Sequence, residues 1–283
     1  MIDFQRLGAV VAKTVTMRPR EGNPEPRWFP ASWRRAHEAG ECIYLNSIGL
    51  TNPGIVAALR EKAPTWAGWK VPVIFSIAGE TVEEFGSMAA TAEGTPGIAA
   101  IELNLSCPNV ENGAHFSHSA EIAGKTVARV KSSTSLPVIP KLSPNVPNIV
   151  PIIEAVTFAG ADAVTLTNTI PAMTIDIEAR KPMLGGITGG ISGPALRPVA
   201  VALVYQAARG AVDVPIIGVG GIFTARDALE FIMAGATAVQ IGSANLVDFR
   251  APLEVLDGLR AYMGEHGVAD IGELVGAAWK GLP

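Results

Sequence analysis

The stretch Val214–Ser243, VPIIGVGGIFTARDALEFIMAGATAVQIGS, decides the fold class, because it predicts a strand, a helix and a second strand in direct succession. Val214–Val219 and Ala238–Ile241 are short apolar runs that are typical of buried strands. Thr224–Ala234 between them has a helical period and begins with the spacing of a capping box. The stretch therefore predicts a β-α-β unit with parallel strands.

The same alternation recurs along most of the chain. Apolar runs are followed by a polar or glycine turn and then by a segment of helical period. The further strands that we expect are Ala9–Lys13, Val71–Ala78, Ala99–Ser106, Pro137–Leu142 and Ala163–Thr167, and the further helices are Val82–Ala92, Glu121–Ser132, Ile149–Ala159 and Pro194–Ala208. Parallel strands with this connectivity form either an open doubly wound sheet or a closed (β/α)8 barrel.

Polar and glycine residues stand at the carboxyl ends of the expected strands, which favours the barrel. They are Lys13, Ser76, Asn104, Lys141, Asn168, Gly220-Gly221 and Gly242-Ser243. A barrel gathers its chemistry on this face, whereas a doubly wound sheet needs a glycine-rich fingerprint after its first strand, which the sequence lacks. We therefore expect residues 1–283 to form one α/β domain, a (β/α)8 TIM-type barrel, although only seven of the eight strands can be counted.

Two long insertions, Thr16–Leu50 and Pro171–Ser192, interrupt the alternation. Loops of this length in a compact domain are usually lids or binding loops, so we expect each to add a small antiparallel cap over the barrel mouth. Val110–Ser119 has no strong helical period and is expected to be a mobile lid. Its residues His115 and His118 are more typical of solvated loop positions than of metal ligands.

Composition argues against several classes of protein. With 22 Lys and Arg against 26 Asp and Glu, and no basic cluster, the chain is not expected to bind nucleic acid. The N-terminus resembles neither a signal peptide nor an anchor, and no apolar run approaches the length of a membrane span. Two cysteines, Cys42 and Cys107, cannot form a disulfide framework, so we expect a cytoplasmic location.

The motif Glu102-Leu-Asn-Leu-Ser-Cys-Pro-Asn109 brings two carboxamides and a thiol to the end of an apolar run. Pro108 stops the strand, which leaves the Cys107 thiol where it can reach a ligand, flanked by Asn104 and Asn109. A buried cysteine in a turn is the structural alternative, but the rest of the chain favours an active-site loop. A thiolate is an effective base, and cationic and amide neighbours can lower a thiol pKa from its usual value of about 8.5.

Two glycine clusters and two lysines point to a phosphorylated cofactor. Gly218–Ile222 and Gly242–Ala244 end the last two strands, where paired barrel loops bind a phosphate through backbone N–H groups. Lys13 and Lys141 each end a strand, and a lysine there is costly unless it meets an anion or a polarised carbonyl. A fixed ammonium would raise the electron affinity of an isoalloxazine, so a flavin fits. Ordinary tight turns and solvated lysines are the structural alternatives.

Together with several further segments, these features resemble the class 1 dihydroorotate dehydrogenases, and among them the catalytic subunits of the NAD-linked (B-type) enzymes. The resemblance spans nearly the whole chain and rests on Lys13–Thr16, Gly22–Arg27, Leu45–Gly54, Glu102–Val110, Lys141–Asn145, Asn168-Thr169, Ile187–Pro194, Ile217–Ile222 and Gly242–Ala244. It implies an FMN-binding barrel that oxidises dihydroorotate to orotate in de novo pyrimidine (UMP) biosynthesis.

The resemblance also implies roles for individual residues. Cys107 would be the catalytic base that takes the C5 proton of dihydroorotate, while C6 passes a hydride to N5 of FMN. The substrate would be held by Lys13, Asn46, Ile48, Gly49, Leu50, Asn104, Asn109, Asn168 and Thr169. The FMN would be held by Lys13, Thr14, Ser76, Asn104, Lys141, Gly193, Gly220, Gly221, Gly242 and Ser243. No metal is implied.

The same resemblance also implies partners, and it shows one difference between this chain and the family. A homodimer is expected, together with an iron-sulfur FAD subunit for electron transfer, because the chain has neither a cysteine cluster nor a dinucleotide fingerprint. Members of the family begin with a further strand that carries an Ala-Ser-Gly turn, which implies that the first barrel strand is absent from this chain unless Glu41–Asn46 supplies an eighth strand. A flavin barrel acting on another dihydropyrimidine and a truncated barrel without FMN stay open as alternatives.

Overall fold

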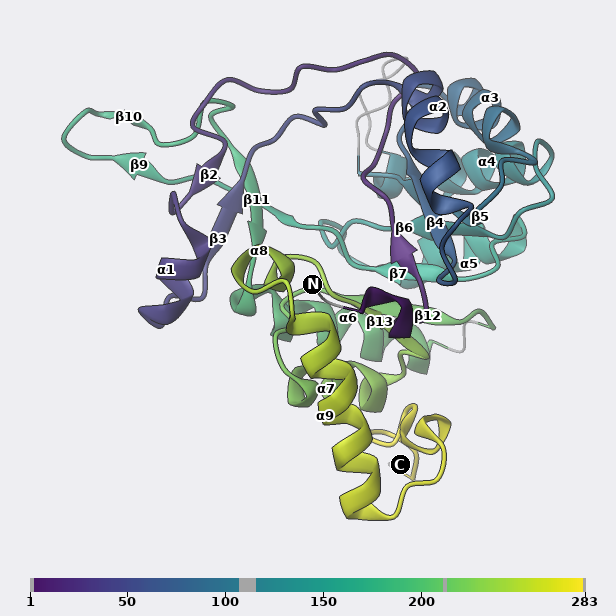
Figure 1. Cartoon of the computed structure of the whole chain (residues 1–283), viewed down its shortest axis with the longest axis vertical. Helices are drawn as coiled ribbons and strands as arrows, with labels where there is room; N and C mark the ends of the chain where they lie inside the picture. The colour runs from purple at the N-terminus through teal and green to yellow at the C-terminus, as the bar shows by residue number, and fades with distance from the viewer. Residues whose placement is uncertain (1–2, 107–115, 211–212, 282–283) are drawn as a thin grey trace.

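A computed structural model describes residues 3–106, 116–210 and 213–281. Its central element is a sheet of seven parallel strands that curls around an axis, in the order β1-β4-β5-β6-β7-β12-β13 (Figure 1). The strands are β1 (Val10–Val11), β4 (Val73–Ile77), β5 (Ile98–Asn104), β6 (Val138–Lys141), β7 (Val164–Leu166), β12 (Ile216–Val219) and β13 (Ala238–Gln240). The seven predicted strands and the TIM-like α/β fold are confirmed, and β1 and β13 form the two edges of the sheet.

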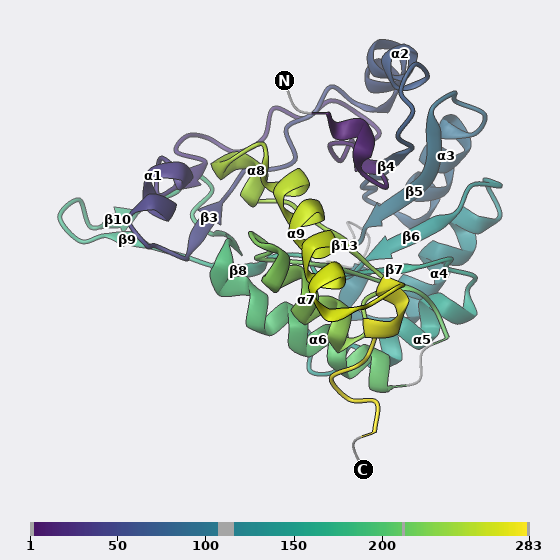
Figure 2. The same cartoon turned by 60° about the horizontal axis from the view of Figure 1, so that its bottom comes forward.

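Helices follow the strands and cover the outer face of the sheet (Figures 1 and 2). They are α2 (Ile55–Trp66), α3 (Val82–Ala92), α4 (Ala120–Lys131), α5 (Val150–Phe158), α6 (Arg197–Arg209), α7 (Ala225–Ala234) and α9 (Ala251–His266). Helix α6 begins later than predicted, because Pro194–Leu196 forms a separate 3-10 turn, η3. Helices α2 and α9 were not predicted, since Pro64 lies inside α2 and glycines lie inside α9, and both residue types disfavour helix interiors.

The barrel interior is layered. Ala100, Ile139 and Ala163 pack with Ile74 and Ile217 into an apolar floor. Alternate residues of a strand point to the same side, so Glu102 and Asn104 follow Ala100 into the interior at successively higher levels. Ser76 lies opposite Glu102, and Asn104 lies opposite Lys141, in the strand register. The interior therefore changes from apolar to polar towards the carboxyl ends of the strands, where a TIM barrel carries its chemistry.

The main hydrophobic core lies between the outer face of the sheet and the helices. Phe75 of β4 and Leu103 of β5 are fully buried there, with Phe85 of α3 and Val127 of α4. Outward and inward residues alternate along these strands, so one side of each strand stabilises the layer of helices and the other side lines the interior.

The two insertions form one shared cap rather than two separate ones. Its antiparallel sheet has the order β2-β3-β11-β8, with β2 (Trp28–Phe29), β3 (Tyr44–Asn46), β11 (Gly189–Ser192) and β8 (Ile170–Ala172). Strand β9 (Ile175–Asp176) pairs with β10 (Lys181–Pro182) in a hairpin that projects from the cap (Figure 1). The predicted antiparallel cap is confirmed. The hypothesis that Glu41–Asn46 supplies an eighth barrel strand is wrong, because Tyr44–Asn46 pairs only within the cap.

An aromatic cluster fixes the cap to the barrel loops. Trp33 in the short helix α1 (Trp33–Glu38) and Tyr44 pack with Phe223 and with Val247 of helix α8 (Ala244–Val247). The ring of His37 stacks on Phe223 with centroids 4.9 Å apart, and its Nδ1 lies 2.9 Å from the Tyr44 hydroxyl. Burial, with smaller effects of Cys42 and Glu41, raises the pKa of Tyr44 above its usual value. The cluster therefore couples the cap to the loops after β12 and β13.

Short turns at the two ends of the chain pack against the barrel. In η1 (Phe4–Arg6), Phe4 packs on Trp69 with ring centroids 4.8 Å apart, and Arg6 forms an ion pair with Asp257 of α9. This turn therefore spans the open side of the sheet between β1 and β13. Near the other end, after η4 (Ile271–Leu274), the indole N–H of Trp279 donates to the Ala234 carbonyl at 3.0 Å. Among the described residues, no helix is both long and apolar enough to cross a membrane.

The predicted lid Val110–Ser119 is only partly described, because residues 107–115 lie outside the described ranges. Phe116–His118 forms the 3-10 turn η2, and Ser119 caps α4 by accepting a hydrogen bond from the Ile122 N–H at 3.3 Å. Phe116 is fully buried, with its ring edge-on to Phe85 at 5.2 Å. A buried aromatic ring therefore anchors the end of this segment at Phe116, and the mobility of the predicted lid stays a prediction.

Candidate active site

A cavity of about 1210 Å³ lies inside the barrel and extends to the open side between β1 and β13. Its walls are largely apolar and include Val11, Val239, Val255 and Leu256. Polar side chains converge on it from the strand ends, namely Lys13, Thr14, Ser76, Glu102, Lys141 and Gln240. A large cavity with apolar walls and a few convergent polar groups is typical of a cofactor site.

Two lysines give the cavity a positive end. Lys13 follows β1 and Lys141 ends β6, so both stand at the carboxyl side of the sheet, as predicted. Lys13 stays exposed, yet partial burial of its ammonium group lowers its pKa below the usual 10.5. Desolvation destabilises the charged form of this ammonium group, and an anionic partner would stabilise it again. This position therefore favours a negatively charged ligand.

Thr14 and Ser76 form a hydroxyl pair beside Lys13. Their hydroxyl oxygens lie 2.9 Å apart and link the chain after β1 to the end of β4. Hydroxyls can donate or accept, so this pair can meet either kind of atom on the edge of a flat heterocycle. Lys13, Thr14, Ser76, Lys141 and Gly242 of the predicted cofactor set all line the cavity.

The predicted glycine loops meet on the neighbouring rim. The Gly193 N–H donates to the Ser243 hydroxyl at 3.3 Å, and a Cβ on Gly221 would lie 2.7 Å from the Gly193 carbonyl oxygen. Gly221 has a φ of +72°, which also favours glycine. Gly220, with a φ of +133°, precedes it in the same turn. Backbone from three loops is therefore brought together without side chains in between, which suits a phosphate held by N–H groups.

Asp227 fixes the position of this rim. Its carboxylate accepts hydrogen bonds from the backbone N–H groups of Phe223 at 3.0 Å and Thr224 at 2.8 Å, and it forms an ion pair with Arg197 at the start of α6. The Thr224 hydroxyl caps α7 in return, so the predicted capping box is present. One carboxylate thus joins the glycine turn after β12 to the helix that follows Gly193.

The predicted substrate residues form a connected group near the cap. Asn168 donates from Nδ2 to Asn104 Oδ1 at 3.1 Å, and the Thr169 N–H donates to Asn168 Oδ1 at 2.8 Å. Thr169 packs on Gly190, where an added Cβ would lie 2.1 Å from the threonine hydroxyl. Gly190 is paired in register with Asn46 on β3, whose side chain donates to the Gly190 carbonyl at 3.4 Å. The structure therefore brings Asn46, Asn104, Asn168 and Thr169 together.

The segment Ile48–Leu50 is held separately in a tight turn after β3. The Asn23 N–H donates to the Ile48 carbonyl at 3.0 Å, and Gly49 and Leu50 have positive φ values of 72° and 57°. In the described part of the chain, no hydrogen bond joins this turn to Asn104 or Asn168. Cys107 and Asn109, the predicted base and its neighbour, lie outside the described residues.

The residues present fit a flavin mononucleotide. The cavity provides apolar walls for a ring system, lysines and hydroxyls for its polar edge, and a rim of backbone N–H groups for a phosphate. In the described residues, no group of three or more His, Cys, Asp or Glu side chains could hold a metal ion.

Sequence reasoning missed several polar residues of the site. Gln240 interrupts the apolar strand β13 and reaches Glu102 across the interior. Ser192 accepts from Asn46 Nδ2 at 3.2 Å, and Asn145 donates to the Thr169 carbonyl at 3.4 Å. A polar residue inside an otherwise apolar strand was a usable signal for Gln240. Ser192 and Asn145 lie in the segments Ile187–Pro194 and Lys141–Asn145 that carry the family resemblance, but no spacing in the sequence relates them to their partners, which only the folding of the cap and barrel brings close.

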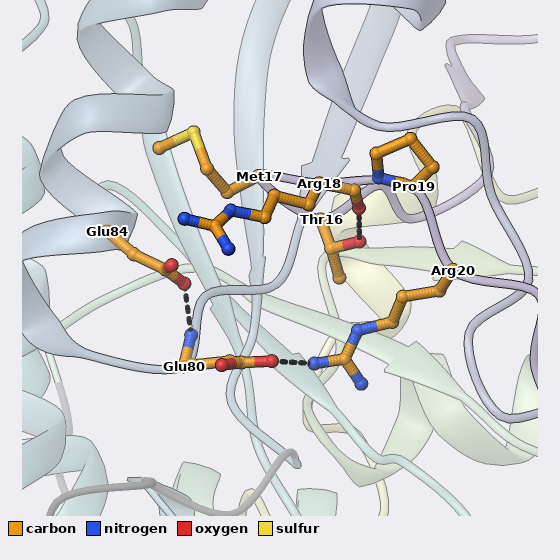
Figure 3. Close-up of a pocket in the computed structure, with 7 residues that line it drawn as sticks. All are labelled: Thr16, Met17, Arg18, Pro19, Arg20, Glu80 and Glu84. Carbon is orange, nitrogen blue, oxygen red and sulfur yellow. Dashed lines mark hydrogen bonds and ion pairs between the residues drawn. The ribbon is translucent and has the colours of Figure 1, made fainter.

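A smaller pocket of about 420 Å³ opens beside the chain that leaves β1 (Figure 3). It is lined by Thr16–Arg20 with Glu80 and Glu84, and Arg20 forms an ion pair with Glu80. The Glu80 N–H donates to Glu84 Oε2 at 2.8 Å at the start of α3. These contacts hold the first insertion against the barrel. None of the predicted site residues lines this pocket, so it stands apart from the candidate active site.

Comparisons with known proteins agree with this arrangement. A family model described as dihydroorotate dehydrogenase matches residues 1–263. Dihydroorotate dehydrogenase B (NAD(+)), catalytic subunit, from Desulforudis audaxviator is 51% identical over 280 residues, which cover 99% of this chain and 88% of the relative. Proteins with the same description from Desulforamulus reducens and Geotalea uraniireducens are 48% and 45% identical, each over 98% of this chain and 88% of their own length.

The family model and the relatives cover nearly the whole chain. The structure has the parallel barrel sheet with polar residues at its strand ends and the antiparallel cap. The chain therefore belongs to the dihydroorotate dehydrogenase family, the flavin-dependent oxidoreductases that oxidise dihydroorotate in pyrimidine biosynthesis.

Proposed function

We propose that this chain is an FMN-dependent catalytic subunit that oxidises dihydroorotate to orotate with Cys107 as the base. The observation that carries the proposal is the cavity inside the barrel, where Lys13, Lys141, Thr14 and Ser76 converge beside apolar walls. The connected amides above it supply the second half of a site, since a planar imide is matched by paired donors and acceptors.

The cofactor would be held from two sides. Lys13 and Lys141 would face the polar edge of the ring system, and the N–H groups around Gly193, Gly221 and Ser243 would bind the phosphate. FMN, when bound, supplies the acceptor for the hydride that leaves C6 of dihydroorotate. The positive charge of the lysines favours an anionic ligand over a neutral one.

The substrate would be oriented by the amide group that the cap completes. Asn104 and Asn168 are already hydrogen-bonded to one another, and Thr169 holds Asn168 in place through its backbone N–H. Asn46 comes from the cap and meets the same group through β11. Fixing these side chains before binding lowers the entropy cost of holding the substrate in a reactive orientation.

Cys107 would take the proton from C5 of dihydroorotate as its thiolate. The C5–H electron pair then forms the C5–C6 double bond while the hydride leaves C6, so the products are orotate, a thiol and a reduced acceptor. Support comes from the sequence position of Cys107, three residues after Asn104, at the end of a strand whose neighbour ends in Lys141. A nearby cation favours the thiolate over the thiol.

An electron-transfer partner subunit would reoxidise the enzyme. The relatives are named catalytic subunits of NAD(+) enzymes, a name that implies a further subunit. The chain has two cysteines and no glycine-rich dinucleotide fingerprint, which is too little for an iron-sulfur centre or a second nucleotide site of its own.

The proposal is tested by anaerobic reduction of the FMN-loaded protein. Dihydroorotate should bleach the flavin absorbance in a stopped-flow experiment, whereas dihydrouracil, which lacks the carboxylate, should do so far more slowly. Cys107→Ser should retain FMN and slow the reduction by about 10²–10⁴-fold, as expected for a lost general base. Cys42→Ser is the matched control, because Cys42 is exposed and lies in the cap, and it should behave as wild type. Equal rates in Cys107→Ser and wild type would exclude Cys107 as the base, and faster reduction by dihydrouracil would favour another dihydropyrimidine as substrate.

A further inference from the structure

A buried acid inside the barrel has no part in the reaction proposed above. Glu102 of β5 is 2% exposed and lines the large cavity. Its Oε2 accepts hydrogen bonds from Thr165 Oγ1 of β7 at 3.2 Å and from Gln240 Nε2 of β13 at 3.0 Å. Strands β5, β7 and β13 are not neighbours in the sheet, so these side chains meet across the interior. Both contacts place Oε2 in the role of acceptor.

The level of Glu102 in the barrel is informative. Two residues below it, Ala100 belongs to the apolar floor with Ile139. Two residues above it, Asn104 lies opposite Lys141 and binds Asn168. The floor offers the acid no polar partner, and Ser76 lies opposite it in the strand register on β4. Glu102 therefore occupies the layer between a dry floor and the candidate active site.

The charge of Glu102 is not cancelled by a direct ion pair. Lys13 and Lys141 line the same cavity, but in the described ranges neither forms an ion pair with Glu102 within 4.0 Å. Its two partners, a threonine and a glutamine, are neutral donors that stabilise a carboxylate without neutralising it. In an interior of low effective dielectric, such a charge acts over several ångströms on whatever fills the cavity.

We propose that Glu102 sets the relative affinity of the site for the reduced and the oxidised form of the bound flavin. Its negative charge opposes the positive field of Lys13 and Lys141, so it weakens binding of the reduced, more negative flavin relative to the oxidised form. The lysines favour uptake of electrons, and Glu102 limits that preference so that the electrons can be passed on. The inference rests on the proposed function, because it takes FMN to be the group in the cavity.

The test removes the negative charge of Glu102 without changing the shape of its side chain. Glu102→Gln retains the size of the side chain and one acceptor oxygen but has no negative charge. We expect the ratio of reduced-form to oxidised-form flavin affinity to rise about tenfold, which corresponds to a midpoint potential about 30 mV higher for a two-electron couple. The potential is measured by dye-coupled spectroscopic titration of the FMN-loaded protein, and the affinity of oxidised FMN by fluorescence titration of the apoprotein.

Two further variants separate charge from packing. Glu102→Asp retains the charge while it shortens the side chain, so the potential should stay near that of wild type even if FMN affinity falls. Thr165→Val is nearly isosteric and removes one donor, so the carboxylate is less shielded and the potential should fall. Thr165 itself does not line the cavity, so Thr165→Val remains a usable test where Glu102→Gln fails to fold.

The outcomes distinguish the two proposals. A higher potential in Glu102→Gln, with Glu102→Asp unchanged, supports the inference. Equal potentials in wild type and Glu102→Gln, or an equal rise in Glu102→Gln and Glu102→Asp, overturn it and leave the proposed function in place. Where Glu102→Gln does not fold, a fall in Thr165→Val supports the inference, and an unchanged or higher potential overturns it. Wild-type protein that binds no FMN overturns the proposed function, and the inference falls with it.

Discussion

The rim that joins the glycine loops should depend on one carboxylate, that of Asp227. Its side chain is 9% exposed, and it serves three partners at once: the N–H groups of Phe223 and Thr224, and the guanidinium of Arg197. Asp227→Ala removes all three interactions. We expect the stability of the barrel to fall and the affinity for FMN to fall with it, because the turn that holds Gly220 and Gly221 loses its attachment to α6.

The loss of stability in Asp227→Ala can be estimated from the exposure of each partner. Each backbone N–H that loses its acceptor in a partly buried place costs about 1–1.5 kcal/mol. The Arg197 side chain is 31% exposed, so its ion pair is worth about 1 kcal/mol rather than the larger value of a fully buried pair. The free energy of unfolding should therefore fall by about 3–4 kcal/mol in Asp227→Ala. Asp227→Asn retains one acceptor oxygen and should lose about half as much.

Thermal melting of the FMN-free protein measures this loss. For a chain of this size, 1 kcal/mol corresponds to about 2–4 °C, so Asp227→Ala should melt roughly 6–16 °C below wild type. Glu230→Gln is the matched control, because Glu230 is the second acidic partner of Arg197 at 3.5 Å but is 49% exposed and accepts no hydrogen bond from the turn. Its melting temperature should stay within about 2 °C of wild type. If Asp227→Ala and Glu230→Gln have the same melting temperature, the Asp227 carboxylate does not anchor the turn that holds Gly220 and Gly221.

Three further predictions concern other parts of the molecule. Because burial lowers the pKa of Lys13, its ammonium deprotonates below pH 10.5, so FMN affinity should fall as pH rises through that lowered pKa; fluorescence titration should show this fall in wild type and its absence in Lys13→Met. Phe116→Ala should cost about 3–5 kcal/mol of stability in chemical denaturation, whereas Ser117→Ala should be neutral or stabilising, because the Ser117 hydroxyl is buried and has no hydrogen-bond partner among the described residues. The isolated chain should pass electrons from dihydroorotate to dyes but not to NAD; rapid NAD reduction without a second subunit would contradict the proposed partner.

Much of the fold could be predicted because the strands and most helices are encoded locally. Helix α3 begins and ends at the predicted residues, since Thr81 caps it and an apolar face recurs along it. Helix α9 could not be predicted in the same way. Its stability comes from packing on α7 rather than from local helix preference, since it contains Gly258 and Gly264.

The candidate site was predictable to the extent that its residues follow strand ends. Lys13 follows β1 after one residue, and Ser76 and Lys141 lie in the last two positions of β4 and β6. A parallel sheet brings all such positions to one edge. The partners of Glu102 were not predictable, because no sequence spacing relates it to Thr165 and Gln240. Their meeting depends on the curvature of the whole sheet.

The shared cap sets an order of events in folding. Strand β11 pairs with β3 on one side and β8 on the other, and Asn46 reaches the Gly190 carbonyl from 144 positions away in the sequence. Strands β4, β5 and β6 pair with partners that follow closely in the chain, so they can associate while synthesis is still in progress. The first insertion has to wait without its partner until Gly189–Ser192 has left the ribosome. The amide group at the mouth of the barrel therefore forms only after β4–β7 have been made, and a nascent chain that ends before β11 already has part of the barrel but not the amide group that Asn46 completes.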